Sequence, residues 1–152
     1  EKGVRMHTDQ FHPEGPDNLL ITSVDAALAG QNTLLAAESL GYGGVIIGLV
    51  RYEAAQVAKL FNLPDYTYPV FGMALGVPNE EHEVKPRLPL NQVVFEEEYQ
   101  EQSTEAIEAY DRVQADYAGV RATTSWSQRL AEQFGQDEPS STRKNLEQKK
   151  LL

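Results

Sequence analysis

The turn at residues 41–48 (Gly-Tyr-Gly-Gly-Val-Ile-Ile-Gly) constrains the fold most, because it joins a long helical pattern to a strand pattern. Before the turn, apolar residues recur near a 3.6-residue period from residue 18 to residue 40, and Asp17 is a candidate N-cap. Gly41 suits the position just after a helix, since it adopts positive φ without a Cβ clash. The β-branched run at residues 45–50 then predicts a short buried strand.

The rest of the pattern predicts an α+β fold in which a sheet packs on helices, without the regular βαβ alternation of a doubly wound fold. Residues 1–16 are predicted to be irregular, and residues 136–141 form a polar stretch in which disorder is expected. The other predicted elements are a helix at 53–61, a strand at 66–75, a loop at 76–89, a short strand at 93–95, helices at 104–119 and 126–134, and a basic helical turn within 140–152.

The acidic balance of the chain excludes several classes of partner. A formal net charge of −10 over 152 residues is unsuited to nucleic acid and to an anionic membrane surface. No apolar run approaches the ~20 residues of a membrane span, and no signal-peptide pattern is present. The absence of cysteine excludes disulfides and thiolate metal sites, and it fits a cytoplasmic protein.

Three groups of residues could bind a ligand, and each also has a purely structural interpretation. The glycines of residues 41–48 could let a flat ligand approach the backbone, or they could only cap a helix and turn the chain. Lys85 and Arg87, on either side of Pro86, could straddle a phosphate, or they could offset nearby glutamates in a solvated turn. Arg121, after a predicted helix, could grip a dinucleotide phosphate or be an ordinary surface arginine.

No pattern of side chains indicates an acid–base or metal centre. His7, His12 and His82 lack the spacing of metal ligands. No Gly-x-Ser-x-Gly sequence occurs, which argues against a serine hydrolase. The residues alone therefore assign no catalytic side chain and no metal ligand.

Taken in order, several motifs together resemble the larger, NADPH-type members of the FMN-dependent nitroreductase and flavin reductase family. The resemblance covers most of the chain and is densest from residue 36 to residue 89. The motifs are the run of residues 36–44, Ile47-Gly48, Arg51, Leu63-Pro64, Pro69-Val70-Phe71-Gly72, Leu75-Gly76-Val77-Pro78, Lys85-Pro86-Arg87-Leu88-Pro89, Tyr110-Asp111 and Trp126-Ser127.

This resemblance implies a nitroreductase-like α+β fold, with a mostly antiparallel sheet packed on helices, and an intertwined homodimer that holds FMN at its interface. It implies an NAD(P)H oxidoreductase that reduces nitroaromatics, quinones or free flavin by a ping-pong mechanism. NAD(P)H reduces the flavin, which then passes electrons to a small-molecule acceptor. Because the flavin carries the redox chemistry, no acid–base pair of the protein is required.

The resemblance also assigns the binding residues. Lys85 and Arg87 would contact the FMN phosphate, and the backbone around Ile46, Ile47 and Gly48 would lie along the flavin ring. Arg121 matches an arginine that the family uses for the NADPH phosphate. Basic residues expected before the Trp-Ser pair are missing here, so both NADPH and NADH remain candidate co-substrates. The stretch 136–141 departs from the family's substrate-side residues.

The resemblance extends to the domain organisation. Family members carry an N-terminal His-Arg-Ser-type motif, and nothing like it precedes residue 1. Residues 1–152 are therefore expected to be the C-terminal portion of a single nitroreductase-like domain whose N-terminal part is absent. The alternative is a non-catalytic dimerisation or interaction module, or an inactive fragment of such an enzyme.

Overall fold

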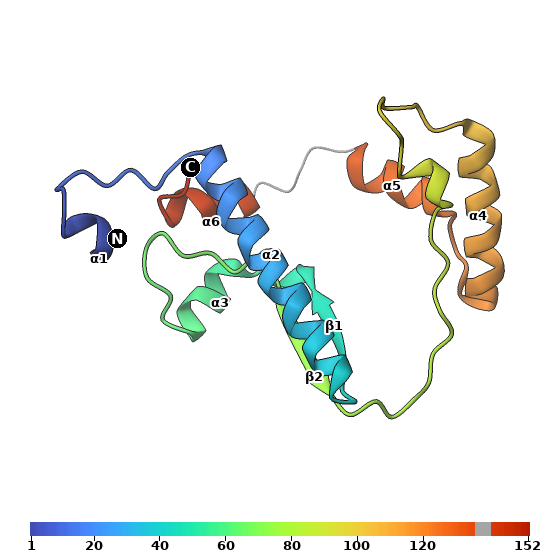
Figure 1. Cartoon of the computed structure of the whole chain (residues 1–152), viewed down its shortest axis with the longest axis horizontal. Helices are drawn as coiled ribbons and strands as arrows, with labels where there is room; N and C mark the ends of the chain where they lie inside the picture. The colour runs from blue at the N-terminus through green and yellow to red at the C-terminus, as the bar shows by residue number, and fades with distance from the viewer. Residues whose placement is uncertain (136–140) are drawn as a thin grey trace. The chain divides into compact units, whose positions relative to one another are not determined.

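The computed structural model describes residues 1–135 and 141–152, and the chain divides into two compact units (Figure 1). Unit 1 comprises Glu1–Glu80 and Pro139–Leu152, and unit 2 comprises Glu81–Glu138. The C-terminal segment therefore belongs to the same unit as the N-terminal half of the chain. The two units are described one at a time.

Unit 1 is built on two antiparallel strands, β1 (Gly43–Ile47) and β2 (Gly72–Gly76), which pack against the long helix α2 (Pro16–Ser39) (Figure 1). Glycines allow the helix and the sheet to come this close. A Cβ atom on Gly44 would lie 2.6 Å from the Leu34 side chain, and one on Gly30 would lie 2.4 Å from the Phe71 ring. The packing of α2 therefore depends on positions that lack a side chain.

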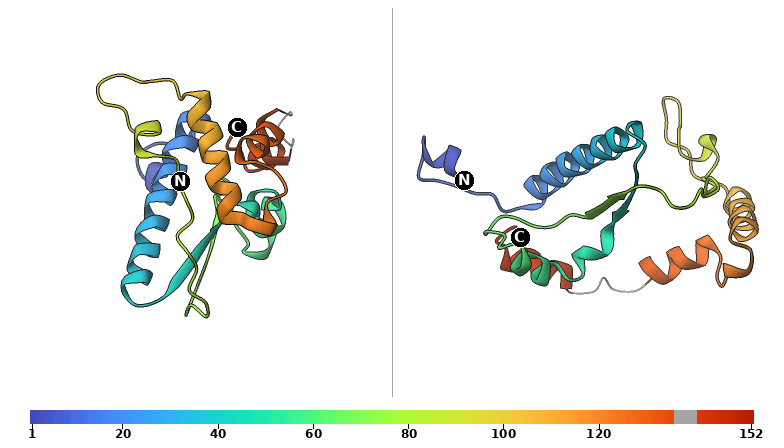
Figure 2. Two further views of the ribbon diagram at one scale, coloured as in Figure 1. Left: turned by 90° about the vertical axis from the view of Figure 1, so that its right-hand side faces the viewer. Right: turned by 90° about the horizontal axis from the view of Figure 1, so that it is seen from below.

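The remaining elements of unit 1 are α1 (Lys2–Arg5), η1 (Gly48–Arg51), α3 (Ala54–Leu60) and α6 (Ser141–Gln148). Helix α6 lies beside α3 although the two are far apart in sequence (Figure 2). Just after α6, the Lys149 ammonium donates to the carbonyls of Leu63 and Pro64 at 2.6 and 2.9 Å. These bonds fasten the C-terminal segment to the loop that follows α3.

Unit 2 contains η2 (Leu90–Gln92), α4 (Thr104–Ala118), η3 (Gly119–Arg121) and α5 (Trp126–Phe134). Helix α4 begins at Thr104, and the hydroxyl of its N-cap residue, Ser103, accepts from the Ala106 amide at 3.1 Å. Helix α5 begins with a capping box, in which the Ser125 hydroxyl and the Gln128 side chain each accept from the other residue's backbone amide. Both starts follow from serines that the sequence places just before a helical pattern.

Two pairs of neighbouring residues dock α5 onto α4. The Tyr110 and Trp126 rings meet edge to face at 5.1 Å between centroids. Next to them, the Asp111 carboxylate accepts from the Ser127 amide at 2.9 Å and from the Ser127 hydroxyl at 2.5 Å. A carboxylate from one helix thus binds the first turn of the other, where the helix dipole favours a negative charge.

Several predicted elements are confirmed. The helices at 53–61, 104–119 and 126–134 occur as α3, α4 and α5 with boundaries within about two residues. Gly41 follows α2 with φ at +83°, as a residue after a helix should. The antiparallel sheet packed on a helix confirms the predicted α+β class.

Other predictions were wrong at the ends of elements. Helix α2 starts at Pro16 with Gly15 as N-cap, so Asp17 lies in the first turn and caps nothing. Residues 2–5, predicted to be irregular, form the short helix α1. The stretch 136–140 of the polar segment lies outside the described residues.

The strand predictions were partly wrong because a strand needs a partner. Strand β1 has five residues and ends where η1 begins, so it pairs only with residues 72–76 and leaves residues 66–71 outside the sheet. Residues 93–95 follow η2 and have no strand beside them, and the structure assigns none there. The β-branched pair at 93–94 raises strand propensity but supplies no partner.

The predicted burial of β1 was also wrong in this chain. Val45, Ile46 and Ile47 are 56%, 44% and 38% exposed. Helix α2 covers one side of the sheet, and much apolar surface of the described residues remains uncovered.

Helix α2 needs a further correction. By length and composition it is apolar enough to cross a membrane, with a mean hydropathy of 1.2 over its most apolar window. The sequence-based prediction that no apolar run approaches the length of a membrane span was therefore wrong for α2. A helix that packs inside a water-soluble protein passes the same test, so the finding indicates a helix that requires an apolar cover of some kind.

The contact between Asp111 and Ser127 gives a pH-dependent prediction. Burial raises the pKa of Asp111, but the hydrogen bonds from Ser127, Ser125 and Trp126 outweigh it and hold the pKa below its ordinary value. We expect Asp111→Asn to lower the free energy of unfolding by about 1–3 kcal/mol at pH 7, because charge-assisted bonds are lost. Urea unfolding monitored by Trp126 fluorescence measures the difference.

The sign of the pH dependence follows from the direction of the shift. A lowered pKa means that the carboxylate stabilises the native state above the pKa of the unfolded chain, and that this contribution disappears as pH falls through the native pKa. The difference between wild type and Asp111→Asn should therefore shrink toward pH 3. Asp116→Asn, at an exposed position of the same helix, is the matched control. An unchanged difference at low pH would contradict the assignment.

Candidate functional site

The Lys85-Pro86-Arg87 segment is held on helix α4 through the Pro86 carbonyl. This oxygen accepts from the Tyr110 hydroxyl at 3.1 Å and from the Gln114 side-chain amide at 2.9 Å. The Gln114 amide also donates to the Tyr110 hydroxyl at 2.7 Å, which closes a triangle of three hydrogen bonds. Tyr110 and Gln114 are 8% and 6% exposed, so these bonds are sheltered from competing water.

A third residue of the same helix face extends this attachment. The Tyr117 hydroxyl donates to the Glu83 carbonyl at 3.3 Å. Positions 110, 114 and 117 are separated by four and three residues, and such residues share one face of a helix. Helix α4 therefore holds the backbone on both sides of Lys85.

The side chains of Lys85 and Arg87 themselves remain available. Both residues are exposed, and the Arg87 guanidinium donates only to the carbonyls of Lys85 and Pro86, at 3.2 and 3.4 Å. Within residues 1–135 and 141–152, neither cation forms an ion pair. Both cations can therefore approach a ligand without first breaking an ion pair with a described residue.

The predicted flavin-ring segment lies in unit 1, at the junction of β1 and η1. Ile46 and Ile47 end the strand with exposed side chains, and Gly48 begins the 3₁₀ turn. A Cβ atom on Gly48 would lie 3.1 Å from the Arg51 guanidinium, which donates to the Val70 carbonyl at 2.9 Å. Any larger residue at position 48 would push against Arg51.

Arg121 lies in η3, directly after α4. Its Nε donates to the Ala118 carbonyl at 3.3 Å, and its guanidinium carbon lies 6.0 Å from the centre of the Tyr117 ring. Arg121 follows Tyr117 by four residues, but α4 ends at Ala118 and Gly119 turns the backbone with φ at +54°, so Arg121 lies beyond the helix. Lys85, Arg87 and Arg121 thus all belong to unit 2, while Ile46, Ile47 and Gly48 belong to unit 1.

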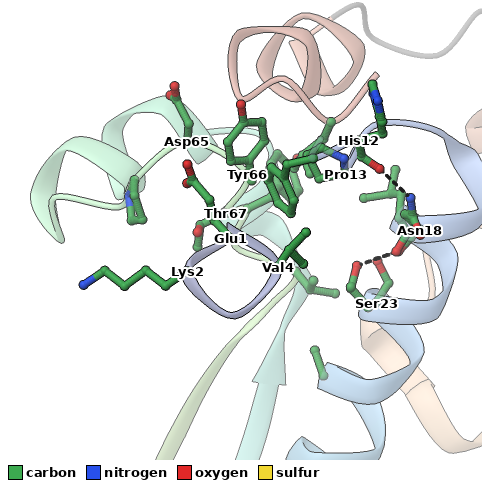
Figure 3. A pocket seen from close by; sticks show the side chains of 18 of the residues that line it. Glu1, Lys2, Val4, His12, Pro13, Asn18, Ser23, Asp65, Tyr66 and Thr67 are labelled. Atoms are coloured by element: carbon green, nitrogen blue, oxygen red, sulfur yellow. Dashed lines mark hydrogen bonds between the residues drawn. The ribbon is translucent and has the colours of Figure 1, made fainter. Parts of the chain in front are cut away.

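A hollow of about 960 Å³ in unit 1 contains none of the predicted site residues. It lies between α1, the N-terminal half of α2 and the loop around Tyr66 (Figure 3). Lys2 is its one lysine or arginine, and Glu1 and Asp65 bring negative charge to the same lining. A hydrogen bond from Lys150, at 2.5 Å, lowers the pKa of Asp65 and keeps it ionised. This balance of charge is unsuited to a phosphate.

Sequence reasoning missed the residues that hold the cation segment. Helical spacing alone would put the apolar residues Ile107, Tyr110, Val113 and Tyr117 on the buried side of α4, yet Val113 is 48% exposed and Gln114 is buried. The spacing of 110, 114 and 117 was a visible signal, but a glutamine is normally assigned to the solvent face. Only a partner carbonyl from a distant segment makes its burial favourable.

Comparisons with known proteins identify the family of the chain. Residues 4–77 match the model of the nitroreductase family, and residues 85–152 match the model of the C-terminal domain of that family. An NADPH-dependent oxidoreductase of Staphylococcus epidermidis is 42% identical over 135 residues, which cover 82% of this chain and 52% of that protein. The chain thus spans about half the length of the curated relatives it matches.

Solved structures give the same result for the fold. Nitroreductase A from Vibrio parahaemolyticus superposes with a TM-score of 0.90 at 37% identity, over 99% of this chain and 63% of that one. The NADPH:FMN oxidoreductase from Vibrio harveyi, complexed with NAD⁺, gives a TM-score of 0.87 at 37% identity, over the same shares of the two chains. The predicted nitroreductase-like fold is confirmed, and the chain belongs to the nitroreductase family.

Proposed function

We propose that this protein is an FMN-dependent NAD(P)H oxidoreductase that reduces small-molecule acceptors such as nitroaromatics, quinones or free flavin by a ping-pong mechanism. The observation that carries the proposal is the pair of exposed cations, Lys85 and Arg87, which have no ion-pair partner among the described residues and whose backbone is fixed on α4. The similar proteins named above include an NADPH-dependent oxidoreductase and an NADPH:FMN oxidoreductase, which supports the same class of reaction.

The residues present fit FMN in two respects. A phosphate needs charge-assisted donors, and two uncompensated cations on a restrained backbone supply them in a chain whose net charge is −10. A flavin ring needs a flat, partly apolar surface with accessible backbone, and the exposed Ile46 and Ile47 beside Gly48 offer one. Pro86 restrains Lys85 to an extended conformation, so less side-chain and backbone freedom is lost on binding.

Each group has a distinct proposed role. Lys85 and Arg87 bind the FMN phosphate, and the backbone at Ile46, Ile47 and Gly48 lies along the ring. Arg121 binds a phosphate of the nicotinamide co-substrate, NADPH or NADH. FMN, when bound, supplies the redox chemistry, and the protein supplies binding and orientation.

We further propose that the protein works as a homodimer in the cytoplasm. The exposed apolar face of α2 supports this, since Leu20, Val24 and Leu28 are 62%, 47% and 61% exposed. Apolar surface of this extent is normally covered in a working protein. The absence of cysteine fits a reducing compartment.

The direct test is the visible spectrum of the protein purified at its natural length. We expect the visible absorbance of a bound flavin, together with oxidation of NADPH or NADH when a quinone or nitroaromatic is supplied. A colourless protein that takes up no added FMN and oxidises neither co-substrate would refute the proposal.

Reversing the charge of both proposed phosphate-binding side chains gives a more specific prediction. Lys85→Glu with Arg87→Glu should abolish flavin retention, because two favourable charges become repulsive toward the phosphate. Dimerisation, measured by sedimentation, should remain, because the Arg87 guanidinium donates to carbonyls of its own segment and neither cation forms an ion pair among the described residues.

The matched control changes the net charge by the same amount elsewhere. Lys59→Glu with Arg112→Glu replaces two cations that are exposed and lie on α3 and α4. This variant should keep its flavin. Equal loss of flavin from both double variants would show that total charge, rather than the segment at 85–87, governs binding.

Replacing Arg121 tests the co-substrate contact. Arg121→Ala should raise KM for NADPH about tenfold or more and change kcat little, because a charge-assisted bond to a phosphate is worth about 1.5–3 kcal/mol. Steady-state kinetics with NADPH and NADH in parallel make the measurement. A larger increase for NADPH than for NADH identifies the extra phosphate of NADPH as the group bound, and an unchanged KM for both would contradict the assignment.

A further inference from the structure

We propose that Tyr110 and Gln114 are positioning residues that set the affinity of Lys85 and Arg87 for the FMN phosphate. This inference rests on the proposed function and adds to it two side chains that touch neither the ligand nor the cations' charged groups. They act through the Pro86 carbonyl, to which they donate at 3.1 and 2.9 Å.

The cation segment needs such support because it has no regular structure of its own. Residues 77–89 contain no helix or strand, so no backbone ladder fixes the direction of the side chains at 85 and 87. Long cationic side chains lose conformational freedom when they bind, and a mobile backbone adds to that cost. Fixing the carbonyl between the two cations removes part of the cost before the phosphate arrives.

The triangle of hydrogen bonds is suited to this task because every donor in it is used. The Gln114 amide has two N–H groups, and it gives one to Pro86 and one to Tyr110. The Tyr110 hydroxyl accepts from Gln114 and donates its own proton to Pro86. Removal of the Tyr110 hydroxyl leaves one N–H of the buried Gln114 amide without its acceptor, and removal of the Gln114 amide leaves Tyr110 as the one donor from α4 to the Pro86 carbonyl, so either change weakens the attachment.

The triangle is itself held by the docking of α5. The Tyr110 ring lies edge to face against Trp126, and the neighbouring Asp111 binds Ser127. These contacts fix the position of the Tyr110 ring and therefore of its hydroxyl. The variant Tyr110→Phe keeps the ring and deletes the hydroxyl, so it separates the positioning of the cation segment from the packing of the ring.

The experiment compares FMN with riboflavin, which has the same ring and no phosphate. Dissociation constants are measured by flavin fluorescence quenching, on protein expressed at its natural length, for Tyr110→Phe, Gln114→Met and the double variant. We expect each single variant to weaken FMN binding about three- to tenfold, with the double variant at the upper end or beyond. Riboflavin binding should change less than about twofold.

A purely structural role predicts a different pattern. General loosening of the fold would weaken FMN and riboflavin alike and would leave their affinity ratio unchanged, which would overturn the positioning role. The matched control is Gln102→Met, since the Gln102 amide donates to the Gln92 carbonyl at 2.6 Å in the same unit. We expect this variant to keep the wild-type ratio.

A second measurement uses the cations themselves. In a protein that already carries Lys85→Ala and Arg87→Ala, adding Gln114→Met should change FMN affinity less than about twofold, because nothing remains to be positioned. An undiminished effect in that background would overturn the inference. A wild-type protein that binds FMN no better than riboflavin would instead refute the proposed phosphate site, so the two failures are distinguishable.

Discussion

The Pro86 carbonyl is the point on which the proposed anion site depends, because it is where an irregular segment joins a helix. Lys85 and Arg87 lie in a stretch without secondary structure, and two sheltered donors from α4 fix the backbone between them. Sheltered hydrogen bonds are stronger than exposed ones, and they are expensive to break once water is excluded. The charge of the site thus comes from a loop, while its geometry comes from a helix.

The exposure of the chain sets the second constraint. Five apolar residues form the buried core of the described residues, and they are divided between the two units: Ala54, Ala58, Tyr110, Leu146 and Leu151. A core of this size buries little apolar surface to set against the conformational entropy lost on folding. Helix α2 and strand β1 therefore require an apolar cover. The local hydrogen bonds and caps described above determine where each element begins and ends, and they contribute less to the stability of the folded chain.

How far the sequence predicts the structure depends on whether the deciding partner is local. The starts of α4 and α5 have local partners, since Ser103 and Ser125 cap amides within three residues, and Gly41 follows the end of α2 as predicted. The same reasoning failed for residues 66–71 and 93–95, since a strand exists only where another strand lies beside it. It also failed for the burial of Gln114, whose partner lies 28 residues away.

For the candidate site, too, the features decided by distant partners could not be predicted from the sequence. Composition alone could not distinguish Lys85 and Arg87 as a phosphate site from a charged turn, because that distinction rests on which ion pairs form. The family resemblance supplied the assignment, and the structure added that these cations form no ion pair with any described residue. The role of α4 could not be foreseen, because it depends on backbone carbonyls at 83 and 86, whose identity carries no sequence signal.

Helix α4 also connects two proposed sites that the sequence treats as separate. Tyr110 holds the segment with Lys85 and Arg87, and Arg121 follows in η3, after α4 has ended at Ala118 and the backbone has turned at Gly119. The Arg121 guanidinium lies beside the end of α4, since it donates to the Ala118 carbonyl at 3.3 Å and lies 6.0 Å from the centre of the Tyr117 ring. The Tyr117 hydroxyl in turn donates to the Glu83 carbonyl, so the last turns of α4 contact both proposed phosphate-binding segments. A substitution of one cation removes one proposed contact, whereas a change in the last turns of α4 displaces the support of both.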